Sequence, residues 1–174
     1  MAKKLTADQK VALEKWREHC RDVQSMTGVS LAVARESPAE RDRRIKRLLS
    51  NYNEFCEYYF AHFMTLRDKS TGEVVKVIHN APFHTKAAMK IRNTPNLKAV
   101  FKWPRGHAKS THIGVFIPLW LIFQPKRLID FMVTVGKSED SAVRLLGDLQ
   151  AELEYNQKLI ADFGEQKNLG SSDC

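Results

Sequence analysis

The chain has 174 residues, 43% of them apolar, which is enough for one globular core, and its net charge of +8 at pH 7 predicts a polyanionic partner. Its three cysteines include no C-x-x-C pair, which excludes a disulfide framework and a cysteine zinc site and favours a reducing cytosol. We expect no signal peptide and no membrane partner, because the longest apolar run, 113–123, is too short to cross a bilayer.

Residues 1–70 are expected to form an N-terminal helical region. Thr6 and Gln9 form a capping-box pattern that opens a first helix. The run Ser37-Pro38-Ala39-Glu40 predicts the start of a second, long helix over 37–66. Aromatic residues line one face of that helix, and we interpret this face as core or partner surface.

Four arginines lie near the start of the long helix, and their side chains have two possible roles. On a solvated face they would only keep the chain soluble. The functional alternative is contact with the phosphate backbone of nucleic acid, for which double-stranded DNA is the expected partner. The candidate DNA-binding residues are Arg41, Arg43, Arg44 and Arg47.

Residues 71–174 alternate between β-prone and helical patterns, which predicts an α/β fold. A short apolar strand is expected over 97–103, and a second over 128–135. Between them lies an apolar helix that Pro118 should kink or end. Strand, helix and strand in this order predict a right-handed βαβ unit with a parallel strand pair. The chain then continues into a helix capped by Ser138 and ends in a frayed tail over Gly170–Cys174.

The loop between the first strand and the apolar helix reads PRGHAKST, from Pro104 to Thr111. A strand, a loop and Lys-Ser-Thr at a helix start form the setting of a phosphate-binding loop, in which backbone N–H groups face an anion. The usual pattern, G-x-x-x-x-G-K-[ST], would place glycines at 102 and 108, where this chain has Lys102 and Ala108. A basic loop between a buried strand and a buried helix is the alternative interpretation.

Individual loop residues have expected roles. Lys109 would bind the phosphates and Ser110 would hold Mg²⁺, with Thr111 as a substitute. A phosphate site at this loop requires two structural features. Segment 97–103 must be a strand whose carboxyl end opens at the loop, and the next helix must begin at the loop. The expected phosphate-binding set is Gly106, His107, Ala108, Lys109, Ser110 and Thr111. His107 and His112 are spaced wrongly for a zinc site on one helix face.

The loop resembles the deviant Walker A motif of the large terminase subunits of tailed bacteriophages. Upstream, Ala81-Pro82-Phe83-His84 resembles the adenine-contacting segment of that family. Downstream, the run from Leu149 to Asn156 and the later Asp162-Phe163-Gly164 are similar to the family's "E-x-x-x-N … F-G" run. The likeness covers roughly residues 75–165.

The resemblance implies an incomplete P-loop NTPase core of the RecA-like type, over 71–174, with ATP and Mg²⁺ as cofactors. Phe83 and His84 would contact adenine, with core packing as the alternative for each. Arg105 would act with Lys109 in catalysis as an arginine finger, with a plain surface arginine as the alternative. The whole protein would drive double-stranded DNA into a procapsid in the cytoplasm of an infected bacterial host. Its partners would be the portal, the small terminase subunit and other large subunits.

A Walker B carboxylate, which this chemistry needs for Mg²⁺, has no match in the sequence. The run Leu128-Ile129-Asp130 continues into Phe131, and Leu145-Leu146-Gly147-Asp148 falls on a predicted helix. We therefore expect the N-terminal part of a longer ATP hydrolase that is inactive by itself. Two alternatives remain: a fragment of another DNA-dependent P-loop ATPase or helicase, and a non-enzymatic recognition or assembly module.

Overall fold

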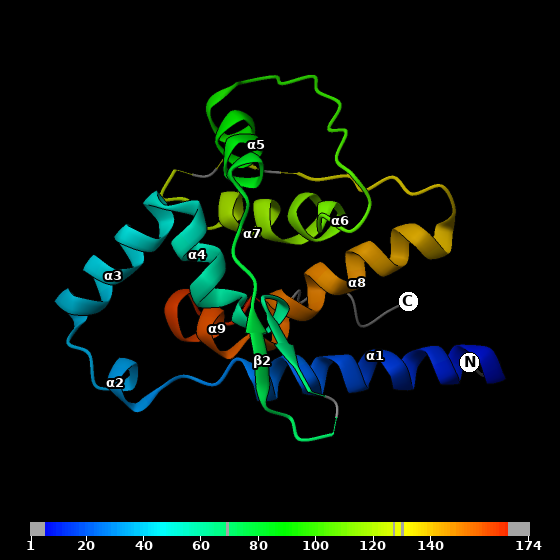
Figure 1. The fold of residues 1–174 in the computed structure, drawn as a ribbon, viewed down its shortest axis with the longest axis horizontal. Coiled ribbons are helices and arrows are strands. Elements are labelled where there is room, and N and C mark those ends of the chain that lie inside the picture. Colours follow the sequence, from blue (N-terminus) through cyan, green and yellow to red (C-terminus); the bar gives the residue numbers. More distant parts are fainter. Residues whose placement is uncertain (1–5, 69, 127, 130, 167–174) are drawn as a thin grey trace, which may run out of the picture.

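The computed structural model describes residues 6–68, 70–126, 128, 129 and 131–166, and the predicted tail Gly170–Cys174 lies outside them. The described residues form a mixed but mostly helical fold (Figure 1). Its α-helices are α1 (Ala7–Met26), α2 (Leu31–Ala34), α3 (Pro38–Ser50), α4 (Tyr52–Tyr59), α5 (Pro82–Asn93), α6 (Lys109–Thr111), α7 (Ile117–Ile122), α8 (Glu139–Tyr155) and α9 (Gln157–Phe163).

Helix starts follow the capping residues in the sequence. Thr6 and Gln9 form the expected capping box of α1, and Ser37 with Glu40 forms that of α3. The prediction of one helix over 37–66 is wrong, because the helix breaks at Asn51. The Asn51 side-chain oxygen accepts the N–H groups of residues 53 and 54, so this residue ends α3 and caps α4.

One large core joins the two regions that the sequence separates at residue 70. On one face of α4, Tyr52, Phe55 and Tyr59 are almost completely buried, which confirms that this aromatic face packs in the core, whereas Tyr58 is half-buried. They share that core with residues of α7, α8 and α9. Trp120 of α7 has no exposed surface, and its indole N–H donates to the carbonyl of Leu49 at 3.0 Å.

The helix after the loop runs without interruption from Lys109 to Ile122. It comprises α6, a π-helical turn over His112–Phe116, and α7. Pro118 does not end it early, contrary to that part of the prediction, since the helix continues to Ile122. Proline cannot donate to the carbonyl four residues before it and clashes with that group, and the wider π-turn immediately before α7 accommodates this defect.

The predicted parallel strand pair is not formed by the described residues. Segments 97–103 and 128–135, apart from residue 130, which is not described, contain no strand. The sheet within the described part of the chain is instead an antiparallel pair, β1 (Thr65–Arg67) and β2 (Val74–Val77). A strand depends on hydrogen bonds to a neighbouring strand, and an apolar extended segment without such a neighbour stays irregular.

Exposure along 131–135 still alternates as in a strand. Phe131, Val133 and Val135 are exposed, whereas Met132 and Thr134 are half-buried. This period of two is the pattern that suggested a strand. The local pattern is therefore present, and the inter-strand pairing is missing.

Candidate functional site

The backbone of the loop 104–108 has two residues in the left-handed region. Gly106 has φ 83° and Ala108 has φ 49° and ψ 30°. The first suits glycine, whereas the second is uncommon for alanine and costs it about 1–2 kcal/mol. Ala108 thus adopts, at a cost, a conformation that the glycine of the usual motif would adopt freely. Turns that mix left- and right-handed residues can gather N–H groups into an anion-binding concavity.

The helix condition for a phosphate site is met, and the strand condition is not. The carbonyl of Ala108 accepts the N–H of His112 at 2.9 Å, so the helix begins directly at the end of the loop. Lys109 and Ser110 occupy its first turn, where backbone N–H groups are free and the helix dipole is positive. Segment 97–103 is not a strand, so this part of the prediction is wrong and no open sheet edge supports the site. The case for an anion at the loop depends on the helix start and the cavity alone.

A cavity of about 440 Å³ lies beside this first turn. Lys109 and Ser110 contribute its polar wall, and the two extended segments expected to be strands provide much of the remainder. The full lining is Phe101, Lys109, Ser110, Ile113, Gly114, Met132, Val133, Thr134, Val135 and Leu145. The predicted Mg²⁺ hydroxyl and the predicted phosphate-binding lysine therefore face one cavity.

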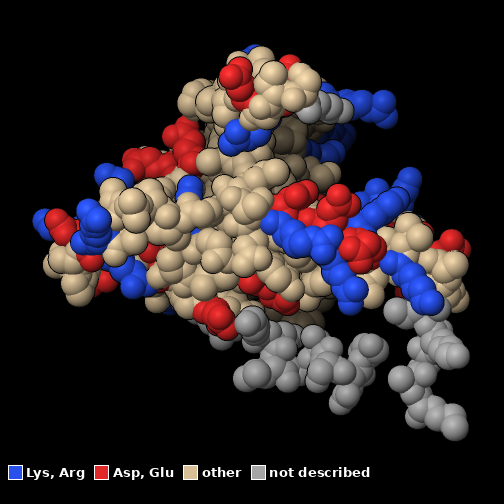
Figure 2. Space-filling model, turned by 90° about the horizontal axis from the view of Figure 1, so that it is seen from below, with Lys and Arg blue, Asp and Glu red and all other residues tan. Residues whose placement is uncertain are grey.

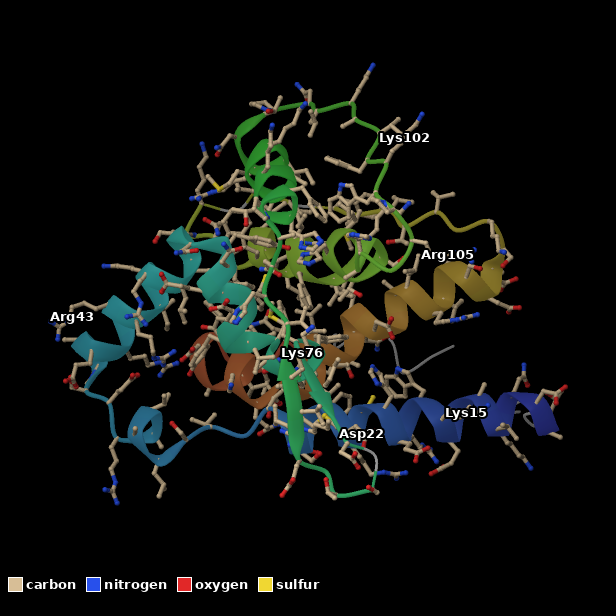
Figure 3. All side chains as sticks on the ribbon, viewed as in Figure 1. Lys15, Asp22, Arg43, Lys76, Lys102 and Arg105 are labelled. Carbon is tan, nitrogen blue, oxygen red and sulfur yellow. The ribbon has the colours of Figure 1, made fainter. Side chains whose placement is uncertain are left out.

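The charged residues of the loop are accessible to solvent. Arg105 and Lys109 are both exposed. Figure 3 shows Arg105 on the loop beside α6 and Lys102 on the segment that leads into it. Two cations close to a helix N-terminus repel one another and the dipole, and a bound anion would reverse the sign of each interaction.

The predicted adenine-contacting residues lie against the loop. The ring of Phe83 is 5.2 Å from that of Trp103 and 5.8 Å from that of His107, measured between centroids. Phe83 is only half-buried, so part of its ring is open. His84 is buried, and both of its ring nitrogens contact backbone atoms of this chain, so its ring is not free to bond a base.

His112 is a buried residue of this site, and its sequence spacing from His107 had been used only to argue against a zinc site. Its Nδ1 lies 2.6 Å from the hydroxyl of Tyr52, and its ring stacks on that of His84 with centroids 3.8 Å apart. Burial, and then the nearby His84, lower the pKa of His112 to about 3. Burial also lowers the pKa of His84. The signal available in the sequence was the position of His112 at the head of a helix that is apolar on all sides.

The four arginines proposed to contact DNA divide into two pairs. Arg44 is only 10% exposed and forms hydrogen bonds with both carboxylate oxygens of Asp162, at 2.6 and 2.8 Å, and with Glu36. Arg41 also points to α9, where it donates to the carbonyls of residues 161 and 162. Arg43 and Arg47 are exposed on α3, with Arg47 near Glu54. Arg43 and Arg47, which make no contact with α9 among the interactions of the described residues, are therefore better placed to meet a DNA backbone than Arg41 and Arg44.

Charge on the surface is mixed on the face that Figure 2 shows. Lys and Arg side chains there are interspersed with Asp and Glu and form no continuous basic area. Arg43 lies at the outer end of α3, far from the loop that carries Arg105 (Figure 3). The two predicted charged sites are therefore separate in space.

Acidic ligands for a metal are missing from the described part of the site. No Asp or Glu lines the cavity among the described residues, and no group of three or more His, Cys, Asp or Glu that could hold a metal ion occurs within the described chain. Among the described residues of its wall, the side chains that carry oxygen are those of Ser110 and Thr134. These residues could assist Mg²⁺ that is already held by a nucleotide, but they do not form a metal site by themselves.

Within the described residues no helix has the length and apolar character needed to cross a membrane. Comparisons of the chain with protein-family models, with curated proteins and with solved structures found no match.

Proposed function

We propose that the loop 104–110 binds the phosphates of ATP with Mg²⁺, as part of a viral DNA-packaging ATPase similar to the large terminase subunit. The observation that carries the proposal is the continuous turn from left-handed Ala108 into a helix whose first residues, Lys109 and Ser110, face a cavity. Such a turn presents N–H groups, a lysine and a hydroxyl to the same small volume.

Roles within the proposed site follow the exposure of each side chain. Lys109 neutralises the terminal phosphates, Ser110 contributes to Mg²⁺, and exposed Arg105 can move to the γ-phosphate. Phe83, half-buried beside the loop, is the better of the two candidates for packing against a base. Hydrolysis requires a carboxylate for the metal, which the described wall of the cavity lacks, so the proposal for this chain is binding rather than turnover.

Lysine 109 provides the test of this function. With ATP and Mg²⁺ at about ten times Kd, binding stabilises the folded chain by about 1.4 kcal/mol, a rise in Tm of roughly 3–5 °C for a domain of this size. We expect Lys109→Ala to abolish this rise, because the lysine charge is lost from the phosphate position. Thermal unfolding with and without ATP and Mg²⁺ measures the effect.

Lys102→Ala is the matched control, since Lys102 is also exposed and precedes the loop but does not line the cavity. It should retain most of the ATP-dependent rise in Tm. A wild-type chain that ATP does not stabilise, or an equal rise in the Lys109→Ala variant, would contradict phosphate binding at this loop.

We further propose that α3 contacts the phosphates of double-stranded DNA, as expected of a packaging motor in the host cytoplasm. The support is the exposure of Arg43 and Arg47 together with the net charge of +8. Replacing both with alanine should weaken binding and reduce the slope of log K against log salt by about one for each lost contact. Fluorescence anisotropy with duplex DNA at several salt concentrations measures this slope.

Lys10→Ala with Lys15→Ala is a control that removes the same charge from α1. If this pair lowers the slope as much as the arginine pair does, DNA contacts the chain through general charge and not through α3. Affinity that does not change between low and physiological salt would contradict DNA binding through phosphates altogether.

A further inference from the structure

We propose that His84 is a positioning residue that holds the phosphate loop in its conformation through the carbonyl of His107. The consequence for nucleotide binding rests on the proposed function. The effect on the loop itself does not, and it can be measured without nucleotide. The resemblance to a known family suggested a different role for His84, contact with adenine.

The two ring nitrogens of His84 have complementary partners. Nδ1 accepts the backbone N–H of Ala81 at 3.0 Å, which closes the first turn of α5. Because Nδ1 is an acceptor, the ring proton of the neutral imidazole lies on Nε2. Nε2 therefore donates to the carbonyl oxygen of His107, also at 3.0 Å. One tautomer satisfies both contacts.

Packing fixes the His84 ring in this orientation. The side chain is 7% exposed, and its face stacks on His112 at 3.8 Å with an angle of 20° between the rings. His112 is itself held by the hydroxyl of Tyr52 in the core, and Trp103 lies 5.1 Å from the His84 ring. A ring held on its faces and at both nitrogens has no freedom to turn toward a base.

The carbonyl that accepts this hydrogen bond belongs to the peptide group between His107 and Ala108, whose orientation sets the conformation of the loop. In a trans peptide the C=O and the following N–H point in opposite directions. Holding the carbonyl of His107 toward His84 therefore directs the N–H of Ala108 away from α5. Ala108 is the alanine with φ 49°, and rotation of this peptide group would release its unfavourable conformation. The His84 hydrogen bond opposes that rotation.

Amide hydrogen exchange of the segment 104–111 tests the inference in two variants. His84→Leu puts an apolar side chain of similar size in place of the ring and removes both the Nε2 donor and the Nδ1 acceptor, whereas His84→Gln places an N–H donor near the position of Nε2. We expect exchange in 104–111 to become about fivefold faster in the leucine variant, the effect of one lost hydrogen bond, and to stay near the wild-type rate in the glutamine variant. Exchange in α1, which lies on another part of the molecule, should not change.

Exchange in 104–111 that is unchanged in His84→Leu, with α1 also unchanged, overturns the proposal, as does failure of glutamine to rescue the loop. If the leucine variant unfolds, the tautomer of His84 in the wild-type chain still tests the proposal. Nitrogen-15 NMR should find His84 in the Nε2–H tautomer, and a predominant Nδ1–H tautomer overturns the proposal.

Nucleotide binding is measured separately, so that the two proposals can fail independently. If ATP and Mg²⁺ stabilise the wild type, His84→Leu should lower the affinity by about fivefold, and His84→Gln should restore it. If ATP does not stabilise the wild type, the proposed function fails, and hydrogen exchange and the tautomer still decide the role of His84. Loss of binding in Lys109→Ala with normal exchange in 104–111 would show that Lys109 acts on the phosphates through its charge, whereas His84 acts by holding the loop.

Discussion

Replacing Asp162 with alanine is expected to destabilise the folded chain by about 3–5 kcal/mol, because it leaves a buried arginine without its main partner. The Asp162 side chain is 2% exposed and accepts hydrogen bonds from both terminal nitrogens of Arg44 and from the hydroxyl of Tyr59 at 2.7 Å. The hydrogen bonds to Asp162 are the main reason why the pKa of Arg44 lies above its ordinary value. The guanidinium therefore stays charged and must be compensated.

Urea unfolding measures this loss, and Arg43→Ala is the matched control. Arg43 is next to Arg44 in the sequence but exposed, and its Nε contacts only the carbonyl of Ala39 on its own helix. The control should change stability by no more than about 0.5 kcal/mol. If Asp162→Ala costs as little as the control, the Arg44–Asp162 pair does not hold α9 on α3. Arg44 would then again be a candidate for DNA contact.

Lowering the pH from 7 to 5 is expected to remove about 2 kcal/mol of stability through His112 alone, a fall in Tm of roughly 4–8 °C. The ordinary pKa of this histidine is 6.5 and the folded value is about 3, so the unfolded chain takes up the proton first. The contribution of His112 is complete above pH 6.5 and is lost progressively as the pH falls from 6.5 toward 3. Protonation would also leave Nδ1 able only to donate to the Tyr52 oxygen, which lies 2.6 Å away.

Comparing the wild type with His112→Asn separates the contribution of His112 to the pH dependence of stability from the contributions of other titrating groups. An asparagine can place its side-chain amide close to the position of Nδ1, where the amide can either accept from or donate to the Tyr52 hydroxyl, and it does not titrate. Thermal unfolding of both proteins between pH 7 and 5 should give a steeper slope for the wild type. Equal slopes would contradict the burial of a neutral imidazole at this position.

Capping residues were sufficient to locate helix starts from sequence. The capping boxes of α1 and α3 and the Ser138 cap of α8 depend on residues within one turn of each other, so no distant part of the chain is needed to form them. The aromatic face of α4 was also correctly interpreted as core. The break at Asn51 depends equally on local residues, but the continuous apolar period across it concealed the cap.

The parallel strand pair was the main error, and it could not have been avoided from the pattern alone. Segments 97–103 and 131–135 have the apolar composition or the alternation of strands, but strand formation depends on hydrogen bonds to residues elsewhere in the chain. In the fold, Phe101 and the residues from Met132 to Val135 line the same cavity rather than pairing. Composition cannot reveal that a neighbouring strand is missing.

The sequence by itself determined where α1, α3 and α8 begin, that residues of α4 are buried, and which loop has the order of residues that phosphate binding needs. The tertiary structure decided what the side chains of that region do. It placed Arg44 in a buried ion pair and left Arg43 exposed, and it turned His84 from a candidate base contact into a contact with the loop. Helix starts depend on groups within a few residues, whereas burial and hydrogen-bond partners depend on residues such as Asp162 and His107 that folding brings from far along the chain.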